Sequence, residues 1–292
     1  MNKIIILLII CFCITTPLYA ESDDSSVFDT HQIEALVGAK GVLDEESNEF
    51  EISIPRTDIN VSAAGIKLTP GLGLVSCATF KTLGSTGEVI GDVVLFEDQI
   101  NLVMKEALEN GLNITALYHH SLWDNPRIMQ MHMEGKGPIK DLAMAVGTIF
   151  NIIKKSNTNT IWARPPVIIN SAKSTLNPNY IEELLGKKGN LKDGVYKLTW
   201  ERETWAAFVG TDREAAILGN IAMKEEEAQN VLKTLLKHNI FIVSLHQHKM
   251  EENPKTMVVR YMGRGSAFKL AEMLKEALEQ ITLSSTEKPQ VE

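Results

Sequence analysis

The sequence predicts an α+β protein made of two tandem ferredoxin-like repeats, each with an antiparallel sheet and with helices on one face. The first observation is a duplication: residues 91–137 align without a gap onto residues 219–265, at a constant offset of 128 and with 13 identities in 47 positions. The second is the order strand–helix–strand–strand–helix in each copy, which puts helices on one face of an antiparallel sheet. The third is an ordinary globular composition, with 44% hydrophobic and 23% charged residues among 292.

The first 20 residues have the pattern of a secretory signal. Lys3 precedes an apolar run of 11 residues, Ile4–Ile14, and Ala20 suits the last position before cleavage. The run is shorter than the roughly 20 residues that a spanning helix needs, so we expect no stable membrane insertion once the signal is removed. The sequence therefore predicts a periplasmic or secreted protein.

The rest of the chain divides into two repeats with a linker between them and a polar tail. The linker is rich in Ser, Asn, Thr and Pro, a composition typical of connecting segments. The first repeat is longer than the second by about 20 residues, around Asp58–Gly73. The predicted boundaries are 1–20 for the signal, 21–154 for repeat 1, 155–178 for the linker, 179–282 for repeat 2 and 283–292 for the tail.

Both repeats are expected to contain the same elements in the same order. Each begins with a short amphipathic helix that ends at a glycine, continues with alternating strands, and has glutamates in the first turn of its next helix, where they suit the helix dipole. A hairpin and a last helix follow. For repeat 1 the elements are His31–Val37, Phe50–Ile54, Val89–Phe96, Glu97–Asn110, Asn113–His120, Ile128–Met133 and Pro138–Lys154. For repeat 2 they are Tyr180–Leu185, Val195–Trp200, Ala216–Met223, Glu225–His238, Ile240–His248, Thr256–Met262 and Ser266–Ile281.

Charge and cysteine content limit the possible partners. With 29 basic and 37 acidic side chains, the formal net charge is -8, so no nucleic-acid partner is expected. Only Cys77 is left after the signal, so an internal disulfide cannot form.

Four histidines on the expected hairpins are the candidate metal ligands: His120 and His132 in repeat 1, and His246 and His248 in repeat 2. Imidazole pairs on neighbouring strands suit zinc, copper or another divalent transition metal. Each repeat supplies only two such imidazoles, so a complete site needs a carboxylate or both repeats. The alternative is that these histidines hold the backbones of turns.

The predicted register decides which of these side chains meet. If the first turn is centred on Pro126, residues whose numbers sum to 252 lie opposite each other, which pairs His120 with His132. The same arithmetic in repeat 2 pairs His248 with Arg260.

Candidate carboxylates are Asp92, Glu97 and Glu225. In a metal-dependent hydrolase, Glu97 would serve as the general base while the metal activates water.

Five further side chains are candidate ligand-binding groups. Tyr118 flanks the first histidine pair, Arg260 lies beside the second, and Arg127 lies at the hairpin tip. Lys136 and Arg264 stand between glycines just before helices, where backbone amides and a cation can hold an anion. Glycines before a helix also occur for purely structural reasons.

The combined pattern resembles the LppY/LpqO family of exported proteins. The residues that carry the resemblance are Gly91-Asp92, Val94-Leu95, Thr115–His120, Pro126-Arg127 and Met131-His132. The resemblance implies export and a duplicated architecture, and it implies no reaction. Members tend to have His-x-His on the first hairpin and a histidine on the return strand. This chain has Tyr118 at the first of these positions, and in repeat 2 it has Arg260 on the return strand.

These observations favour an exported binding protein that holds a divalent metal or a small anionic ligand at the hairpin histidines. The alternatives are a metal-dependent hydrolase that uses the same histidines with a carboxylate base, a two-lobed phosphoesterase, and an envelope protein without a site. The sequence does not decide between an enzyme and a binding protein.

Overall fold

The structure is a computed structural model that describes residues 29–83, 86–155, 168–201, 203–248 and 255–283. The expected signal segment lies outside the described residues, and so do parts of the expected linker and tail.

The described elements follow the expected order in both repeats. Those of repeat 1 are α1 (Thr30–Val37), β1 (Gly41–Asp44), β2 (Glu49–Pro55), β3 (Ser62–Ala63), β4 (Ile66–Lys67), the 3-10 helix η1 (Pro70–Leu72), β5 (Val75–Leu83), β6 (Thr86–Phe96), α2 (Ile100–Glu109), β7 (Asn113–His119), β8 (Asp124–Asn125), β9 (Ile128–Gly137) and α3 (Ile139–Lys155). The 3-10 helix η2 (Ser171–Lys173) lies in the expected linker. Those of repeat 2 are α4 (Asn179–Leu185), β10 (Asn190–Lys192), β11 (Val195–Glu201), β12 (Thr204–Gly210), β13 (Ala215–Lys224), η3 (Glu225–Glu227), α5 (Ala228–Lys237), β14 (Phe241–Gln247), β15 (Thr256–Gly265) and α6 (Ala267–Leu278).

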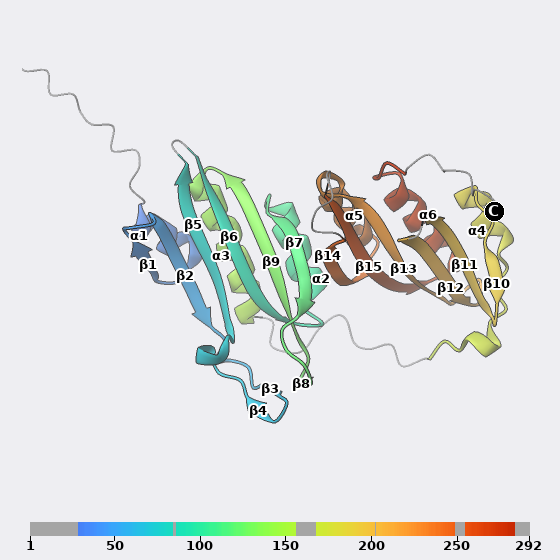
Figure 1. The fold of residues 1–292 in the computed structure, drawn as a ribbon, viewed down its shortest axis with the longest axis horizontal. Coiled ribbons are helices and arrows are strands. Elements are labelled where there is room, and N and C mark those ends of the chain that lie inside the picture. Colours follow the sequence, from blue (N-terminus) through green and yellow to red (C-terminus); the bar gives the residue numbers. More distant parts are fainter. Residues whose placement is uncertain (1–28, 84–85, 156–167, 202, 249–254, 284–292) are drawn as a thin grey trace, which may run out of the picture.

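A single antiparallel sheet of 12 strands runs through both repeats, in the order β1-β2-β5-β6-β9-β7-β14-β15-β13-β12-β11-β10 (Figure 1). The antiparallel pairing agrees with the prediction, whereas the joining of the two repeats into one sheet was not predicted. The junction is the antiparallel pair β7 and β14, in which Leu117 lies opposite Leu245. This pairing covers two edge strands that would otherwise expose unpaired backbone groups.

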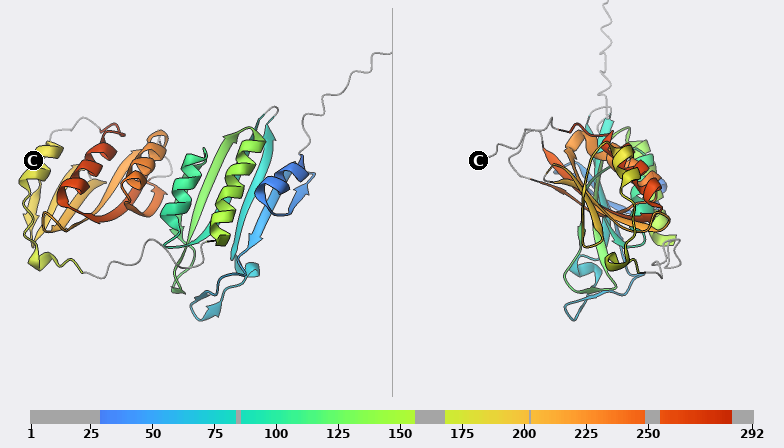
Figure 2. Two further views of the ribbon diagram at one scale, coloured as in Figure 1. Left: turned by 180° about the vertical axis from the view of Figure 1, so that it is seen from behind. Right: turned by 90° about the vertical axis from the view of Figure 1, so that its right-hand side faces the viewer.

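The helices lie on one face of the sheet, as the sequence predicts (Figure 2). Neighbouring helices contact each other in the order α1, α3, α2, α5, α6, α4, so that α2 and α5 meet at the junction. Buried apolar residues of both repeats form one continuous core between the helices and the sheet. No helix within the described residues has the length and apolar character needed to cross a bilayer.

Alternation along β9 separates the core from the open face of the sheet. Met129, Met131 and Met133 are buried in the core. Gln130 and His132 alternate with them and are only partly buried, so they lie on the opposite, open face.

Repeat 1 carries a module that has no counterpart among the described residues of repeat 2. Strands β4, β3 and β8 form a small second sheet beyond one end of the main sheet (Figure 1). Its apolar residues form a separate cluster with Val94 and Ile128 of the main sheet. Arg56 is 2% exposed, donates two hydrogen bonds to the Asp58 carboxylate and donates one to the Val94 carbonyl. Strands β3 and β4 of the module lie within the additional residues that the sequence comparison located around 58–73, whereas β8 comes from the connection between β7 and β9.

Candidate functional site

The hairpin register differs from the predicted one, so His120 and His132 do not lie opposite each other. Between β9 and residues 116–119 of β7, opposed residues have numbers that sum to 248, as in Tyr118 and Gln130. His132 therefore lies opposite Ala116, and the His120 amide bonds to the Ile128 carbonyl at 3.2 Å. The prediction was wrong because the connection is not a tight turn: β8 lies within it and pairs with β3.

The second hairpin departs from its predicted register in the same way. Arg260 lies opposite Ser244, and His246 lies opposite Val258. The His248 amide donates to the Thr256 carbonyl at 2.7 Å, so His248 lies at the end of the ladder and not beside Arg260.

His120 connects the end of β7 to the extra module. Its Nε2 lies 3.1 Å from the carbonyl oxygen of Gly73, and its Nδ1 is buried without a hydrogen-bond partner among the described residues. These contacts agree with the alternative structural role considered for the histidines, in which His120 holds a turn backbone.

His132 forms a pair with Asp92 on the neighbouring strand β6. The two residues lie directly opposite each other, and His132 Nδ1 is 3.1 Å from Asp92 Oδ1. This hydrogen bond is the main cause that raises the pKa of His132 above its ordinary value, while partial burial opposes the rise. No hydrogen bond of the other ring nitrogen, Nε2, is found within the described residues, and in the protonated ring this nitrogen is a donor.

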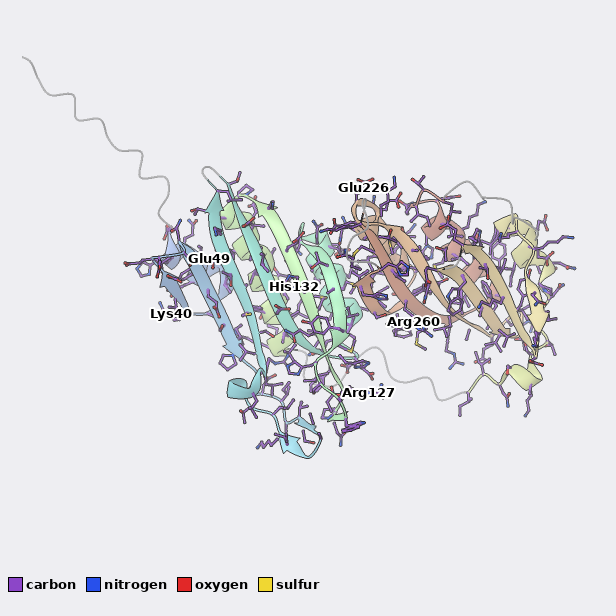
Figure 3. All side chains as sticks on the ribbon, in the orientation of Figure 1. Lys40, Glu49, Arg127, His132, Glu226 and Arg260 are labelled. Carbon is purple, nitrogen blue, oxygen red and sulfur yellow. The ribbon has the colours of Figure 1, made fainter. Side chains whose placement is uncertain are left out.

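The junction brings equivalent positions of the two repeats together, where residues are equivalent if their numbers differ by 128. His132 faces Ala116 in repeat 1, and Arg260 faces Ser244 in repeat 2. Ala116 and Ser244 lie on β7 and β14, the two strands that pair across the junction. Tyr118 and His246, also equivalent, occupy the next open-face positions of these strands. We call His132, Tyr118, Ala116, Arg260, His246 and Ser244 the junction face; Figure 3 labels His132 and Arg260.

Continuing the register of Leu117 and Leu245 sets the arrangement of the junction face. Leu117 and Leu245 are the recorded pair of this ladder, and extension of their antiparallel register by one residue in each direction would place Ala116 opposite His246 and Tyr118 opposite Ser244. In this extended register, His132, Ala116 and His246 follow one another across three strands. Two small side chains occupy the centre of the face, and four larger polar side chains surround them.

Both central strands are irregular just before the junction face. The register shifts between Ile114 and Ala116 in β7, and between Ile242 and Ser244 in β14. Such bulges bend a strand and redirect the side chains that follow, and they are common beside functional sites. Here they precede Ala116 and Ser244 in equivalent positions.

Arg260 is the cationic side chain that repeat 2 contributes to the junction face. Within the described residues, no acidic side chain forms an ion pair with it. Asn220 lies directly opposite Arg260, as Asp92 lies opposite His132. The Oδ1 atom of Asn220 is buried and has no hydrogen-bond partner in the part of the chain that the structure describes.

The remaining candidate residues lie outside the junction face. Glu97, the candidate general base, forms an ion pair with Arg127 at 3.9 Å. Lys136 pairs with Glu88 at 3.7 Å, and Arg264 pairs with Glu214 at 2.8 Å.

The glycines around Lys136 and Arg264 belong to strands and not to anion-binding turns. A Cβ on Gly135 would lie 2.8 Å from Leu112 and 2.9 Å from Leu142. A Cβ on the equivalent Gly263 would lie 2.4 Å from Ile240. Close packing of the helix face against the strand therefore accounts for the glycines at these two positions.

Four of the ten candidate residues meet at the junction face: Tyr118, His132, His246 and Arg260. Sequence reasoning missed Ala116 and Ser244, although the constant offset of 128 contains the signal that marks them as equivalent. Three or more histidine, cysteine or acidic side chains do not gather as a metal-binding group anywhere in the described residues.

Comparison with known proteins identifies the two repeats as copies of one domain. A family model described as Domain of Unknown Function (DUF1259) matches residues 31–152 and 179–280, in agreement with the duplication. No curated protein sequence matches the chain significantly. Among solved structures, the chain is similar to an aspartate kinase from Synechocystis, with 10% identity, a TM-score of 0.24 and coverage of 65% of this chain. The chain spans 25% of the length of that kinase.

Proposed function

The chain belongs to the Domain of Unknown Function (DUF1259) family, and from the arrangement of its junction face we propose that it is a binding protein for a small anionic ligand. The observation that carries the proposal is that Arg260 from repeat 2 and His132 and Tyr118 from repeat 1 lie on one open surface that extends across the junction. The site is built by both repeats together, and neither repeat contains it alone.

The chemistry of these groups favours an anion. A guanidinium group stays charged at all physiological pH values and presents a fork of donors that matches a carboxylate or phosphate. Asp92 favours the protonated form of His132, which is then a second cationic donor. The hydroxyl groups of Tyr118 and Ser244 can donate further hydrogen bonds.

A divalent metal has less support at the same place. His120 bonds to Gly73, and His248 lies at the end of its strand. His132 and His246 are separated by Ala116 on the intervening strand. A metal site at this surface would need ligands closer together than these two imidazoles on alternate strands.

We further propose that the protein acts in the periplasm or outside the cell. The signal-like pattern of residues 1–20 and the resemblance to the exported LppY/LpqO proteins support this localisation. Expression of the full chain in a Gram-negative host, followed by mass measurement of the periplasmic protein, tests it. A mature chain that begins at or near Glu21 is expected, and an uncleaved cytoplasmic chain would contradict the proposal.

The test of anion binding is calorimetric titration of the purified full chain with inorganic phosphate and with small carboxylates. We expect binding by the wild type and its loss in Arg260→Gln. Arg264→Gln is the matched control, because it removes the same charge from the same strand at a position already paired with Glu214.

Two outcomes would overturn the proposal: no binding of any of these anions, or binding that Arg260→Gln leaves unchanged. A parallel titration with Zn²⁺ examines the metal alternative. Zn²⁺ binding that disappears in His132→Ala, with no binding of anions, would favour a metal site over the anion site.

A further inference from the structure

We propose that the junction face binds one small diacid per chain, with one acidic end at Arg260 and the other at His132. The inference rests on the proposed anion-binding function and deepens it by naming the class of ligand. Its basis is the near-symmetry of the two cationic groups about the junction.

The two cationic side chains occupy equivalent positions in different repeats. His132 lies on β9 opposite Ala116, and Arg260 lies on β15 opposite Ser244. Because β7 and β14 pair between them, the two groups flank the same pair of central strands. A ligand with an acidic group at each end matches this two-sided arrangement, whereas a ligand with one acidic group uses only half of it.

The spacing of the strands separates the two groups too widely for one small anion to bridge them. Strands β9 and β15 are three strand spacings apart, which is about 14 Å at the usual separation of hydrogen-bonded strands. His132 and Arg260 also differ by one open-face position along the strands. Even if both side chains lean toward the junction, a gap of several ångströms is left between their donors. Two acidic groups joined by a short chain can span that gap.

The centre of the junction face suits the middle of such a ligand. Ala116 and Ser244 are short, so the ligand can pass over them close to the sheet. Tyr118 and His246 lie on opposite sides of this path. They limit the width of the ligand and add hydrogen-bonding groups beside it.

The position of Asp92 is compatible with an acidic ligand at His132. Asp92 lies on β6, which borders β9 on the side away from the junction. Its carboxylate takes the Nδ1 side of the imidazole, at 3.1 Å, and favours the protonated ring. Nε2 is then a charged donor directed toward the ligand.

The experiment compares unbranched dicarboxylates of increasing length with monocarboxylates of the same carbon number, by calorimetric titration of the full wild-type chain at mildly acidic pH. We expect one site per chain and an affinity for the best dicarboxylate about tenfold or more above that of its matched monocarboxylate, as one additional charge-assisted contact provides. This comparison needs no variant, so it does not depend on how a substitution folds.

Two variants then assign the ends of the ligand. Arg260→Gln and His132→Gln should each lower the affinity for the dicarboxylate about tenfold or more, toward that of the monocarboxylate. The controls Arg264→Gln and His31→Gln should leave it unchanged, since Arg264 is paired with Glu214 and the His31 side chain is 93% exposed on α1.

The outcomes separate the two proposals. Equal affinity for mono- and dicarboxylates, with loss only in Arg260→Gln, would overturn the diacid assignment and leave an anion site at Arg260. Two ligands per chain would overturn the shared site in the same way. Absence of binding by every carboxylate and by inorganic phosphate would overturn the anion-binding function itself.

Discussion

Asn101 and Gln229 occupy equivalent positions, and each hydrogen-bonds to the backbone of the other repeat across the junction. Asn101, on α2, donates to the Ile240 carbonyl at 2.6 Å and accepts from the Ile242 amide at 3.3 Å. Gln229, at the equivalent position on α5, donates to the Ile114 carbonyl at 3.0 Å and accepts from the Ile114 amide at 2.9 Å. Each helix therefore pairs with backbone groups at the start of the central strand of the other repeat. These hydrogen bonds fix the position of each repeat relative to the other at the junction.

Loss of one of these contacts should weaken the whole molecule. Asn101→Ala is expected to lower the free energy of unfolding by about 2 kcal/mol, because it leaves buried backbone groups of β14 and its preceding loop without partners. Urea unfolding measures the change. Asn230→Ala is the matched control, since Asn230 is an exposed asparagine in α5. A loss in Asn101→Ala no larger than that of the control would contradict the proposed role of this contact.

The His132–Asp92 pair should make stability depend on pH near neutrality. The hydrogen bond to Asp92, and more weakly the charges of Asp92 and Glu134, raise the pKa of His132 in the folded state. The pair therefore contributes its full stabilisation below the unfolded pKa of about 6.5 and loses it as pH rises through the higher folded pKa. The contribution is modest because the His132 side chain is 33% exposed.

An NMR titration of the imidazole measures this effect directly. In Asp92→Asn the titration midpoint of His132 should fall, and in Glu134→Gln it should fall less, since the Glu134 charge is the weakest of the causes. An unchanged midpoint in Asp92→Asn would show that the hydrogen bond does not control this histidine.

At Gly147, the Gly→Ala substitution that normally stabilises a helix should instead destabilise the protein. In an open helix interior, Gly→Ala gains up to about 1 kcal/mol. Here a Cβ would lie 2.2 Å from the carbonyl oxygen of Leu36, where α3 packs against α1. Gly147→Ala is therefore expected to destabilise the protein by about 1–3 kcal/mol in thermal or urea unfolding. Thr148→Ala, one residue further along α3, serves as the control, and a more stable Gly147→Ala protein would contradict this packing.

His120 should affect the extra module and leave anion binding intact. His120→Ala removes the contact with the Gly73 carbonyl, so we expect a loss of about 1 kcal/mol in stability and faster proteolysis within residues 58–73. Anion affinity, measured by the same titration as for Arg260→Gln, should equal that of the wild type. Loss of anion binding without a change in proteolysis would contradict this structural role and would indicate that His120 contacts the ligand.

Much of the local structure could be predicted from the sequence. Alternating apolar residues identify strands such as the one that contains Met129, Met131 and Met133, and the glycine at position 38 ends the first helix in the left-handed conformation. Self-similarity at an offset of 128 identifies the duplication and also the residues that are equivalent. The elements follow from local periodicity and the duplication follows from comparison of the chain with itself, so neither requires coordinates.

The candidate site needed the tertiary structure. The register that separates His120 from His132 depends on β8, which pairs with the distant strand β3 and has no local signal in the hairpin sequence. The joining of β7 to β14 depends on backbone pairing between segments more than 100 residues apart, and almost any strand sequence can make such bonds. The sequence by itself therefore determined the elements, their repetition and most of the chemistry-bearing residues. Only the tertiary structure decided which of those residues meet, because long-range strand pairing sets the neighbours of each side chain.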